Sequence, residues 1–276
     1  MPRLARRSLK VVSGAFDRLR APVPGVVILL YHRVGGASKL DVDLEPSLFA
    51  DQMAQLRESA VVVSLEDALE RLTTDRVAPP EPSTPEPSIV VTFDDGTADF
   101  ADVAMPIMQR FGIPVTLYIA TAFIEERKPF PENGRPLSWS ALADLHATGL
   151  VNLGSHTHQH RLLDRVTERE AGDELDRSID VIGDRLGMRP QDFAYPKAVS
   201  PSPAADCAVR TRFRSAALAG TRVNPYGATD PHLLARSPIQ MTDGMRWFRQ
   251  KVAGGMVFED ALRRSLNRVR YSRSTT

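Results

Sequence analysis

The stretch IVVTFDDG, residues 89–96, decides the fold class of this chain. Its apolar and β-branched run predicts a buried strand that ends in two adjacent carboxylates, Asp94 and Asp95. In parallel α/β folds, active sites gather at the carboxyl ends of the strands. Adjacent side chains diverge, so we expect one carboxylate to face a metal ion and the other a substrate or water, with Gly96 allowing a sharp turn. The alternative is an ordinary turn in which one acid caps the next helix.

Outward from this strand, short apolar runs alternate with helical patterns, which predicts an α/β fold with a largely parallel sheet. Capping boxes at Ser64/Asp67 and Thr167/Glu170 mark the starts of two helices. The expected strands are 26–31, 61–63, 89–93, 115–119, 151–155, 193–195, 215–218 and one near 233. The expected helices are 46–58, 64–72, 98–110, 140–147, 167–186 and 243–252.

Length and composition exclude several classes of protein. The 276 residues are 42% hydrophobic and 25% charged, which suits a soluble globular chain with a substantial core. No apolar run approaches the roughly 18 residues of a membrane-spanning helix. The net charge of +1 gives no general attraction for nucleic acid, so no nucleic-acid partner is expected. A single cysteine, Cys207, excludes an intrachain disulfide and suits a reducing compartment.

A second polar cluster follows the expected strand 151–155 and contains His156, His158 and His160, three of the six histidines. His156 and His160 are spaced i,i+4, so one helical turn would bring both imidazoles to one cation while His158 points elsewhere. A polar loop whose histidines cap carbonyl groups is the alternative. Because both clusters follow strands, the sequence predicts a facial set of two imidazoles and a carboxylate, with positions open for water and substrate.

The cofactor predicted from these residues is one divalent metal ion. Zinc fits the ligand types, and cobalt, nickel, manganese and iron stay open. A bound metal lowers the pKa of water toward neutrality, and a second carboxylate nearby can take the proton as the water attacks a carbonyl. The predicted chemistry is therefore hydrolysis of an amide or ester.

The motifs resemble those of a known family. Residues 92–96 (TFDDG) and 155–160 (SHTHQH) are similar to the first two motifs of the polysaccharide deacetylases, the NodB-homology domain of carbohydrate esterase family 4. Residues 30–34 (LYHRV) resemble the opening strand of many members, and 193–196 (FAYP) the third motif; the resemblance covers about 26–240. It implies a distorted (β/α)7-type barrel that removes N-acetyl groups from amino sugars of a polysaccharide or a chitooligosaccharide-like chain.

The resemblance also implies roles for individual residues. Asp94 would be the catalytic base, while Asp95, His156 and His160 would hold the metal. Lys197 stands where the third motif supplies a backbone N–H to the oxyanion. A backbone donor does not depend on its own side chain, so this role can survive a change of residue.

Four further side chains are candidates for contact with the sugar: Tyr31, His32, Trp139 and Tyr195. Trp139 would belong to the aromatic wall that the family uses around the sugar, and Tyr31 and His32 end the first strand. Structural packing is the alternative for these three.

Departures from the family pattern concern the base and the acid. Ala194 stands where many members have an arginine that orients the base, and Ala198 replaces a common glycine. Many members have a histidine as general acid where this chain has Arg236. An arginine does not readily release a proton at neutral pH, so we expect Arg236 to orient a carboxylate or to bind an anionic substrate group. The acid would then be His158 or, as the spacing favours, water held at the metal and shuttled through Asp94.

The expected deacetylase domain is 23–245, with a Pro-rich surface insertion at 77–88. It is flanked by a basic segment, 1–22, and by a C-terminal helix and basic tail, 246–276. The basic ends predict peripheral contact with an anionic membrane, and a solvated terminus is the alternative.

The first residues lack the apolar core of a secretory signal, which favours a cytoplasmic enzyme at the inner membrane surface acting on an acetylated glycan or a lipid-linked oligosaccharide. Two other functions fit the same residues. One is a glycan-binding protein that has lost turnover, suggested by Ala194 and Arg236; the other is a hydrolase of a non-sugar amide.

Overall fold

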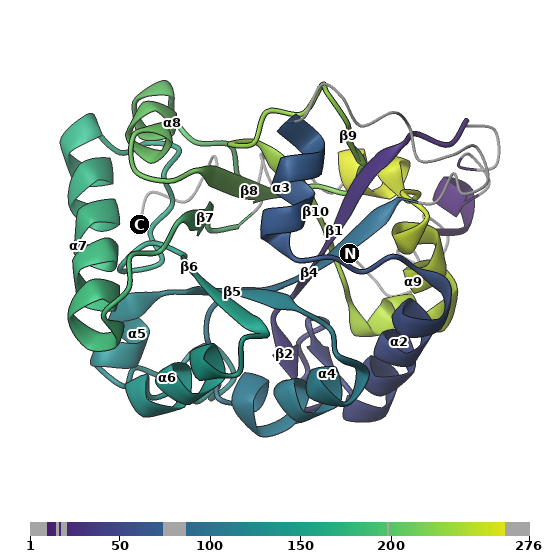
Figure 1. The fold of residues 1–276 in the computed structure, drawn as a ribbon, viewed down its shortest axis with the longest axis horizontal. Helices are drawn as coiled ribbons and strands as arrows, with labels where there is room; N and C mark the ends of the chain where they lie inside the picture. The colour runs from purple at the N-terminus through teal and green to yellow at the C-terminus, as the bar shows by residue number, and fades with distance from the viewer. Residues whose placement is uncertain (1–9, 15–16, 18–20, 74–86, 198, 263–276) are drawn as a thin grey trace.

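Seven parallel strands form a closed barrel in the computed structural model, which describes residues 10–14, 17, 21–73, 87–197 and 199–262 (Figure 1). This architecture confirms the (β/α)7-type barrel. In order around the barrel the strands are β1 (Gly25–Tyr31), β4 (Ser88–Phe93), β5 (Val115–Ile119), β6 (Val151–Ser155), β7 (Asp192–Ala194), β8 (Ser215–Ala219) and β10 (Leu234–Pro238), which pairs with β1 again. The short strands β2 (Arg33–Val34), β3 (Asp43–Leu44) and β9 (Asn224–Pro225) lie outside this ring.

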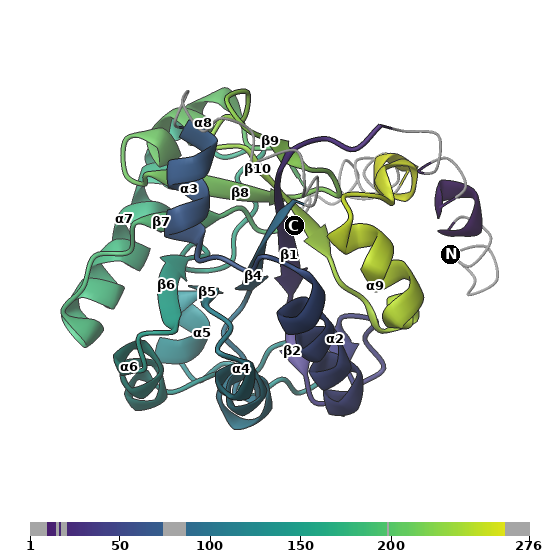
Figure 2. The same ribbon diagram turned by 45° about the vertical axis from the view of Figure 1, so that its right-hand side comes forward.

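Helices surround the barrel and connect its strands (Figures 1 and 2). Those described are α2 (Pro46–Ser59), α3 (Leu65–Thr73), the π-helix η1 (Phe100–Ala104), α4 (Met105–Phe111), α5 (Thr121–Glu125), α6 (Trp139–Ala147), α7 (Glu168–Leu186), α8 (Pro203–Arg210), the 3₁₀-helix η2 (Met241–Asp243) and α9 (Gly244–Val252). Both predicted capping boxes form: Glu170 and Thr167 cap α7 reciprocally, and the hydroxyl of Ser64 accepts from Asp67 N.

The alternation of side chains along β1 separates the barrel interior from the outer core. Val27, Leu29 and Tyr31 pack in the main core with the outer helices. Val26 and Ile28 point the other way and join residues from β4, β5, β7, β8 and β10 in what we call the interior cluster. Because successive residues of a strand face opposite sides, the next inward residues after Ile28 are at positions 30 and 32.

Helix α3 closes one end of the barrel, because Leu65, Leu69 and Leu72 belong to the interior cluster (Figure 1). The expected strand at 61–63 forms only as an isolated β-bridge, with hydrogen bonds from Val63 N to Ile89 O and from Ile89 N to Val61 O. Only Val62 pairs there, in a single bridge to Ile89. The chain between the end of α2 and the start of α3 is too short for a longer ladder.

Large and small side chains fit together inside the barrel. A Cβ at Gly154 would lie 2.5 Å from Tyr118 Cδ1, so the glycine makes room for that ring. Ala194 and Ala217 are small interior residues, and Arg236, which has no exposed surface, occupies the space near them with its guanidinium over the Tyr118 ring. The interior is thus built to hold one buried arginine.

Two other expectations need correction. The helix expected at 98–110 is interrupted by the π-helical turn η1, next to Pro106, which has no N–H to donate to the preceding turn. The expected domain boundary at 245 falls inside α9, whose Phe248 is fully buried in the main core. Residues 77–86 of the expected insertion lie outside the described residues, and Ser88 already begins β4. None of the described helices is long and apolar enough to cross a membrane.

Candidate active site

Asp94 and Asp95 leave the end of β4 in different directions, as expected. Asp94 continues the inward alternation of Thr92 and is 3% exposed. Asp95 and Gly96 both have positive φ, 77° and 93°, which turns the chain sharply at this point. A Cβ at Gly96 would lie 3.1 Å from Ile119 Cγ2, so both the backbone and the space favour glycine here.

Arg236 holds Asp94 from inside the barrel. Its guanidinium donates two hydrogen bonds to the carboxylate, from Nη1 to Oδ1 at 2.5 Å and from Nη2 to Oδ2 at 2.8 Å, and a third from Nη1 to Thr92 Oγ1 at 3.3 Å. Such a bidentate pair fixes the orientation of a carboxylate. Arg236 therefore orients the carboxylate, the first of its two expected roles. Its assignment as a substrate-binding residue is wrong, because the side chain is fully buried behind Asp94.

The same pair keeps Asp94 ionised. Burial alone would raise the pKa of this carboxyl group, but the positive charge of Arg236, the interaction with His156 and the hydrogen bonds from Arg236 lower the pKa to about 2. At neutral pH Asp94 is therefore a proton acceptor with a fixed direction.

The histidine loop after β6 is not the helical turn that the spacing predicted. Thr157 and His160 have φ of 66° and 58°, and the carbonyl of His158 accepts a hydrogen bond from Ala122 N at 2.9 Å. These two left-handed residues reverse the chain, so the imidazoles of His156 and His160 still meet, with ring centroids 5.0 Å apart. The i,i+4 spacing therefore predicted the correct pair of histidines, but the helical conformation that it implied is wrong.

Asp95, His156 and His160 converge in a ligand cluster whose donor atoms all lie within 4.8 Å of one another. Oδ1 of Asp95 is 3.4 Å from His160 Nε2 and 3.8 Å from His156 Nε2. The Nδ1 atom of His156 lies 2.7 Å from the carbonyl oxygen of Ala194, so Nδ1–H donates there and Nε2 is left to bind a metal.

The two imidazoles are neutral, the form that binds metals. Burial lowers the pKa of His156 and outweighs the opposing effects of the nearby carboxylates. Burial and the neighbouring His156 lower the pKa of His160 to about 4. Two neutral imidazoles and a carboxylate fit a divalent cation.

His158 lies on the other side of the loop. Its Nδ1 is 2.8 Å from Thr121 Oγ1, and its charged neighbours are Glu174, Arg177 and Glu126 of the surrounding helices and turns. The expectation that His158 points away from the ligand cluster is confirmed, and the structure does not bring it to Asp94 as an acid.

His32 is the residue that sequence analysis undervalued. It follows the inward alternation of β1, and Asp94 N donates to Tyr31 O at 3.1 Å, which aligns the ends of β1 and β4. Burial raises the pKa of Asp95, but the interaction with His32, followed by those with the two ligand histidines, lowers it below its usual value. Among the described residues Nδ1 of His32 is buried without a partner. The alternation of inward and outward residues along 28–32 is the sequence signal that could have placed His32 on the inward side, at the mouth of the barrel.

Two of the expected sugar contacts, Tyr31 and Tyr195, pack in the core, and a third, Trp139, is partly buried. Tyr31 faces outward, is fully buried and donates from its hydroxyl to Gln52 Oε1 at 2.9 Å. Tyr195 is 1% exposed and donates to Asp206 Oδ1 at 3.3 Å. Trp139 packs against the main core at the start of α6. The expectation that Tyr31 and Tyr195 line the pocket is wrong, because the strand alternation turns both into the core.

Lys197 lies at the turn after β7, with φ of 61°, and its charge contributes to lowering the pKa of His160. The third motif thus comes close to the ligand cluster, although the role of the Lys197 N–H at the oxyanion stays a prediction.

Comparisons with known proteins agree with this geometry. The family model described as polysaccharide deacetylase matches residues 81–216, which contain both carboxylates and the histidine loop. The Bacillus subtilis protein YxkH, named as a polysaccharide deacetylase, is 22% identical over 220 residues, covering 79% of this chain and 72% of that one. Residues 81–216 match the polysaccharide deacetylase family, a family of hydrolases, whereas His32 and Arg236 lie outside the matched residues.

Solved structures share the fold. The Streptococcus pyogenes deacetylase PplD in complex with acetate has a TM-score of 0.69 and 20% identity, covering 84% of this chain and 99% of that one. IcaB from Ammonifex degensii has a TM-score of 0.70 and 23% identity, covering 83% and 98%.

Metal analysis tests the ligand cluster. We expect the purified His156→Ala/His160→Ala double variant to lose most bound metal, because two of three donors are gone, whereas Asp94→Asn and His158→Gln keep the parent content. Mass spectrometry measures the metal content of each variant, and circular dichroism shows whether the variant is folded. Unchanged metal in a folded double variant would contradict the assignment, and loss of metal in Asp94→Asn would mean that the two aspartates exchange roles.

Proposed function

We propose that this protein is a metal-dependent hydrolase that removes N-acetyl groups from amino sugars of a polysaccharide or oligosaccharide. The observation that carries the proposal is one arrangement at the barrel mouth. Asp95, His156 and His160 form the ligand cluster, and Asp94 stands beside it, 3.7 Å from His156 Nε2, in a fixed orientation.

The ligand cluster would hold one divalent cation, for which zinc fits and cobalt, nickel, manganese and iron stay open. Such an ion, when bound, supplies Lewis-acid polarisation of the acetyl carbonyl and a lower pKa for water. The second-layer hydrogen bond from His156 to the Ala194 carbonyl supports this use, because it fixes the imidazole that faces the carboxylates.

Asp94 would take the proton from the attacking water. Each carboxylate oxygen can accept more than one hydrogen bond, so both stay available for a further donor while Arg236 holds them. The arginine prevents rotation of the carboxylate and keeps it ionised. The backbone N–H of Lys197 would donate to the oxyanion that forms on the acetyl group.

His32 would protonate the leaving amine. It stands near both aspartates at the barrel mouth, and Arg236 cannot release a proton at neutral pH. This assignment replaces His158, and the water route through Asp94 is the alternative.

Arg236 also weighs against the binding-protein alternative. Ala194 lacks the arginine side chain that many family members use to orient the base, but Arg236 reaches the same carboxylate from β10. The two departures compensate each other, which favours turnover. An acetylated glycan, free or lipid-linked, is the proposed substrate. The structurally similar deacetylase PplD was solved in complex with acetate, which is the product that deacetylation releases.

Acetate release tests the activity. We expect the metal-loaded protein to release acetate from N-acetylglucosamine oligomers or another acetylated glycan of a panel, to stop when a chelator removes the metal, and to recover on adding zinc or cobalt. Glycan binding without acetate release would support the non-catalytic alternative, and acetate only from non-sugar amides would support the third function.

The acid is tested by a pair of variants with metal content as control. We expect His32→Gln to lower kcat by about 10² to 10⁴-fold and to change the alkaline limb of the pH–rate profile, because glutamine cannot donate a titrating proton. His158→Gln should stay within about twofold of the parent, since it lies outside the site. Parent-like turnover and alkaline limb in metal-loaded His32→Gln would show that His32 is not the acid.

A further inference from the structure

The two ends of the described chain contribute a pair of helical segments, residues 10–14 and 257–262, which we call the terminal pair (Figure 2). Glu259 N donates to Ser13 Oγ at 3.2 Å. Next to the pair in sequence, Met256 N donates to Asp17 Oδ2 at 2.6 Å. Segments more than 240 residues apart in sequence therefore lie side by side on the outside of the barrel.

The terminal pair is held firmly against the barrel. Lys10 is 1% exposed, and its ammonium pairs with Asp243 Oδ1 at 2.5 Å, while Lys251 pairs with the other oxygen of the same carboxylate at 2.7 Å. A Cβ at Gly14 would lie 2.6 Å from Gln250 Oε1, so the helix approaches α9 closely. The alternative of a solvated terminus is wrong for residues 10–14, and Lys10 is not available to a membrane.

The amphipathicity of the terminal pair is inverted. Its polar side chains face the protein: Lys10, Ser13 and Asp260 are at most 2% exposed. Its apolar side chains face outward: Val11, Val12, Phe258 and Leu262 are exposed by 51%, 44%, 46% and 36%. A helix that meets only water shows the opposite pattern. These four residues form the apolar terminal surface.

Exposed apolar side chains are concentrated here. Of the six large apolar residues in the described chain that are at least 36% exposed, four form the apolar terminal surface, and Val23 lies near it at the entrance to β1. The sixth, Val61, lies elsewhere, before α3. A gathered patch, unlike scattered single residues, marks an interaction surface.

Charge identifies what this surface meets. Residues 1–20 carry one acid and six basic residues, five of them arginines besides the buried Lys10, and residues 263–276 carry five arginines and no acid. These ends contribute +10 to a chain of net charge +1, so the residues between them carry −9. The basic residues are thus attached in sequence to the terminal pair, and the rest of the chain would be repelled by an anionic surface.

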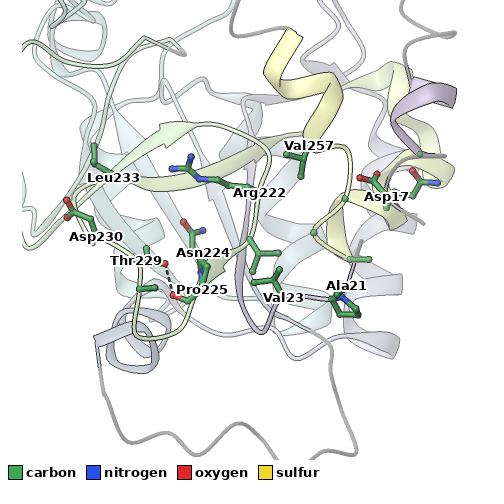
Figure 3. Close-up of a pocket in the computed structure, with 18 residues that line it drawn as sticks. Asp17, Ala21, Val23, Arg222, Asn224, Pro225, Thr229, Asp230, Leu233 and Val257 are labelled. Atoms are coloured by element: carbon green, nitrogen blue, oxygen red, sulfur yellow. Dashed lines mark hydrogen bonds between the residues drawn. The ribbon is translucent and has the colours of Figure 1, made fainter. Parts of the chain in front are cut away.

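A hollow of about 720 Å³ adjoins the terminal pair, with Val23 and Val257 at its edge and Arg222 on its wall (Figure 3). None of its lining residues belongs to the ligand cluster or to its neighbours Asp94, His32 and Arg236. The lining holds one arginine and two aspartates, Asp17 and Asp230, so the hollow itself carries no excess of positive charge for an anionic group.

We propose that the apolar terminal surface, together with the arginine-rich residues that adjoin the terminal pair in sequence, docks this protein on an anionic lipid bilayer. Apolar side chains enter the interface while arginines pair with lipid phosphates, the combination that gives peripheral membrane binding. This inference does not rest on the proposed catalytic function, because it concerns other residues and is measured without substrate.

Vesicle sedimentation tests the docking. We expect the full chain to bind phosphatidylcholine vesicles that contain about 30% phosphatidylglycerol, to release as salt rises, and to ignore pure phosphatidylcholine. The quadruple variant Val11→Ser/Val12→Ser/Phe258→Ser/Leu262→Ser should bind at least about tenfold more weakly, and Val61→Ser should match the parent. Equal binding by parent and quadruple variant would overturn the proposal. So would a parent dimer that the quadruple variant dissociates, because the surface would then meet a second copy.

A second measurement does not depend on removing apolar groups. In a Cys207→Ser background, an environment-sensitive fluorophore on Val12→Cys should shift to the blue when anionic vesicles are added, because the side chain enters an apolar medium. The same fluorophore on Val61→Cys should not shift. Equal spectra for the two positions would contradict docking through this surface.

Discussion

The buried ion pair between Arg236 and Asp94 is the constraint around which the rest of the barrel is arranged. Removing each of the two charges from water costs several kcal/mol. Only well-placed attraction and hydrogen bonds between the groups offset this cost. The barrel supplies that geometry: a bidentate contact, a hydroxyl from Thr92 and the ring of Tyr118 beneath the guanidinium. Small residues on β7 and β8 leave the room that the arginine needs. The contacts that stabilise the buried charges are therefore the same contacts that orient the carboxylate of Asp94.

The alternation of strands explains how distant parts of the sequence reach one site. His32, Asp94, His156 and Arg236 come from four strands, and each occupies an inward position at or near the carboxyl end. Because the strands are parallel and paired in register, those ends meet at the same mouth. The glycine and left-handed residues that follow β4 and β6 then turn Asp95 and His160 toward the same point. Inward-facing residues at the ends of parallel strands thus bring short sequence motifs together into one site for metal binding and proton transfer.

The sequence predicted the strands and the ligand residues well, because buried strands have strong apolar runs and because the two motifs are specific. Strands β5 and β6 match their expected ranges. It failed where the answer depends on dihedral angles or on neighbours across the barrel. The i,i+4 spacing of the histidines suggests a helix, whereas positive φ at two residues produces the contact. Tyr31 and His32 are adjacent in sequence, and only the register of β1 shows that one enters the core and the other the mouth.

Arg236 illustrates the same limit, because only the closed barrel shows that an arginine on β10 orients the base in place of one on β7. The most direct measurement of this role is kcat of metal-loaded Arg236→Lys, with metal content and thermal unfolding measured alongside. Lysine keeps the charge but cannot donate the two parallel hydrogen bonds. We predict unchanged metal and a kcat lower by about 10- to 100-fold, the range typical of losing a hydrogen-bonding partner that orients a residue of a metal site. A folded, metal-loaded Arg236→Lys with the kcat of the parent would contradict this role of the arginine.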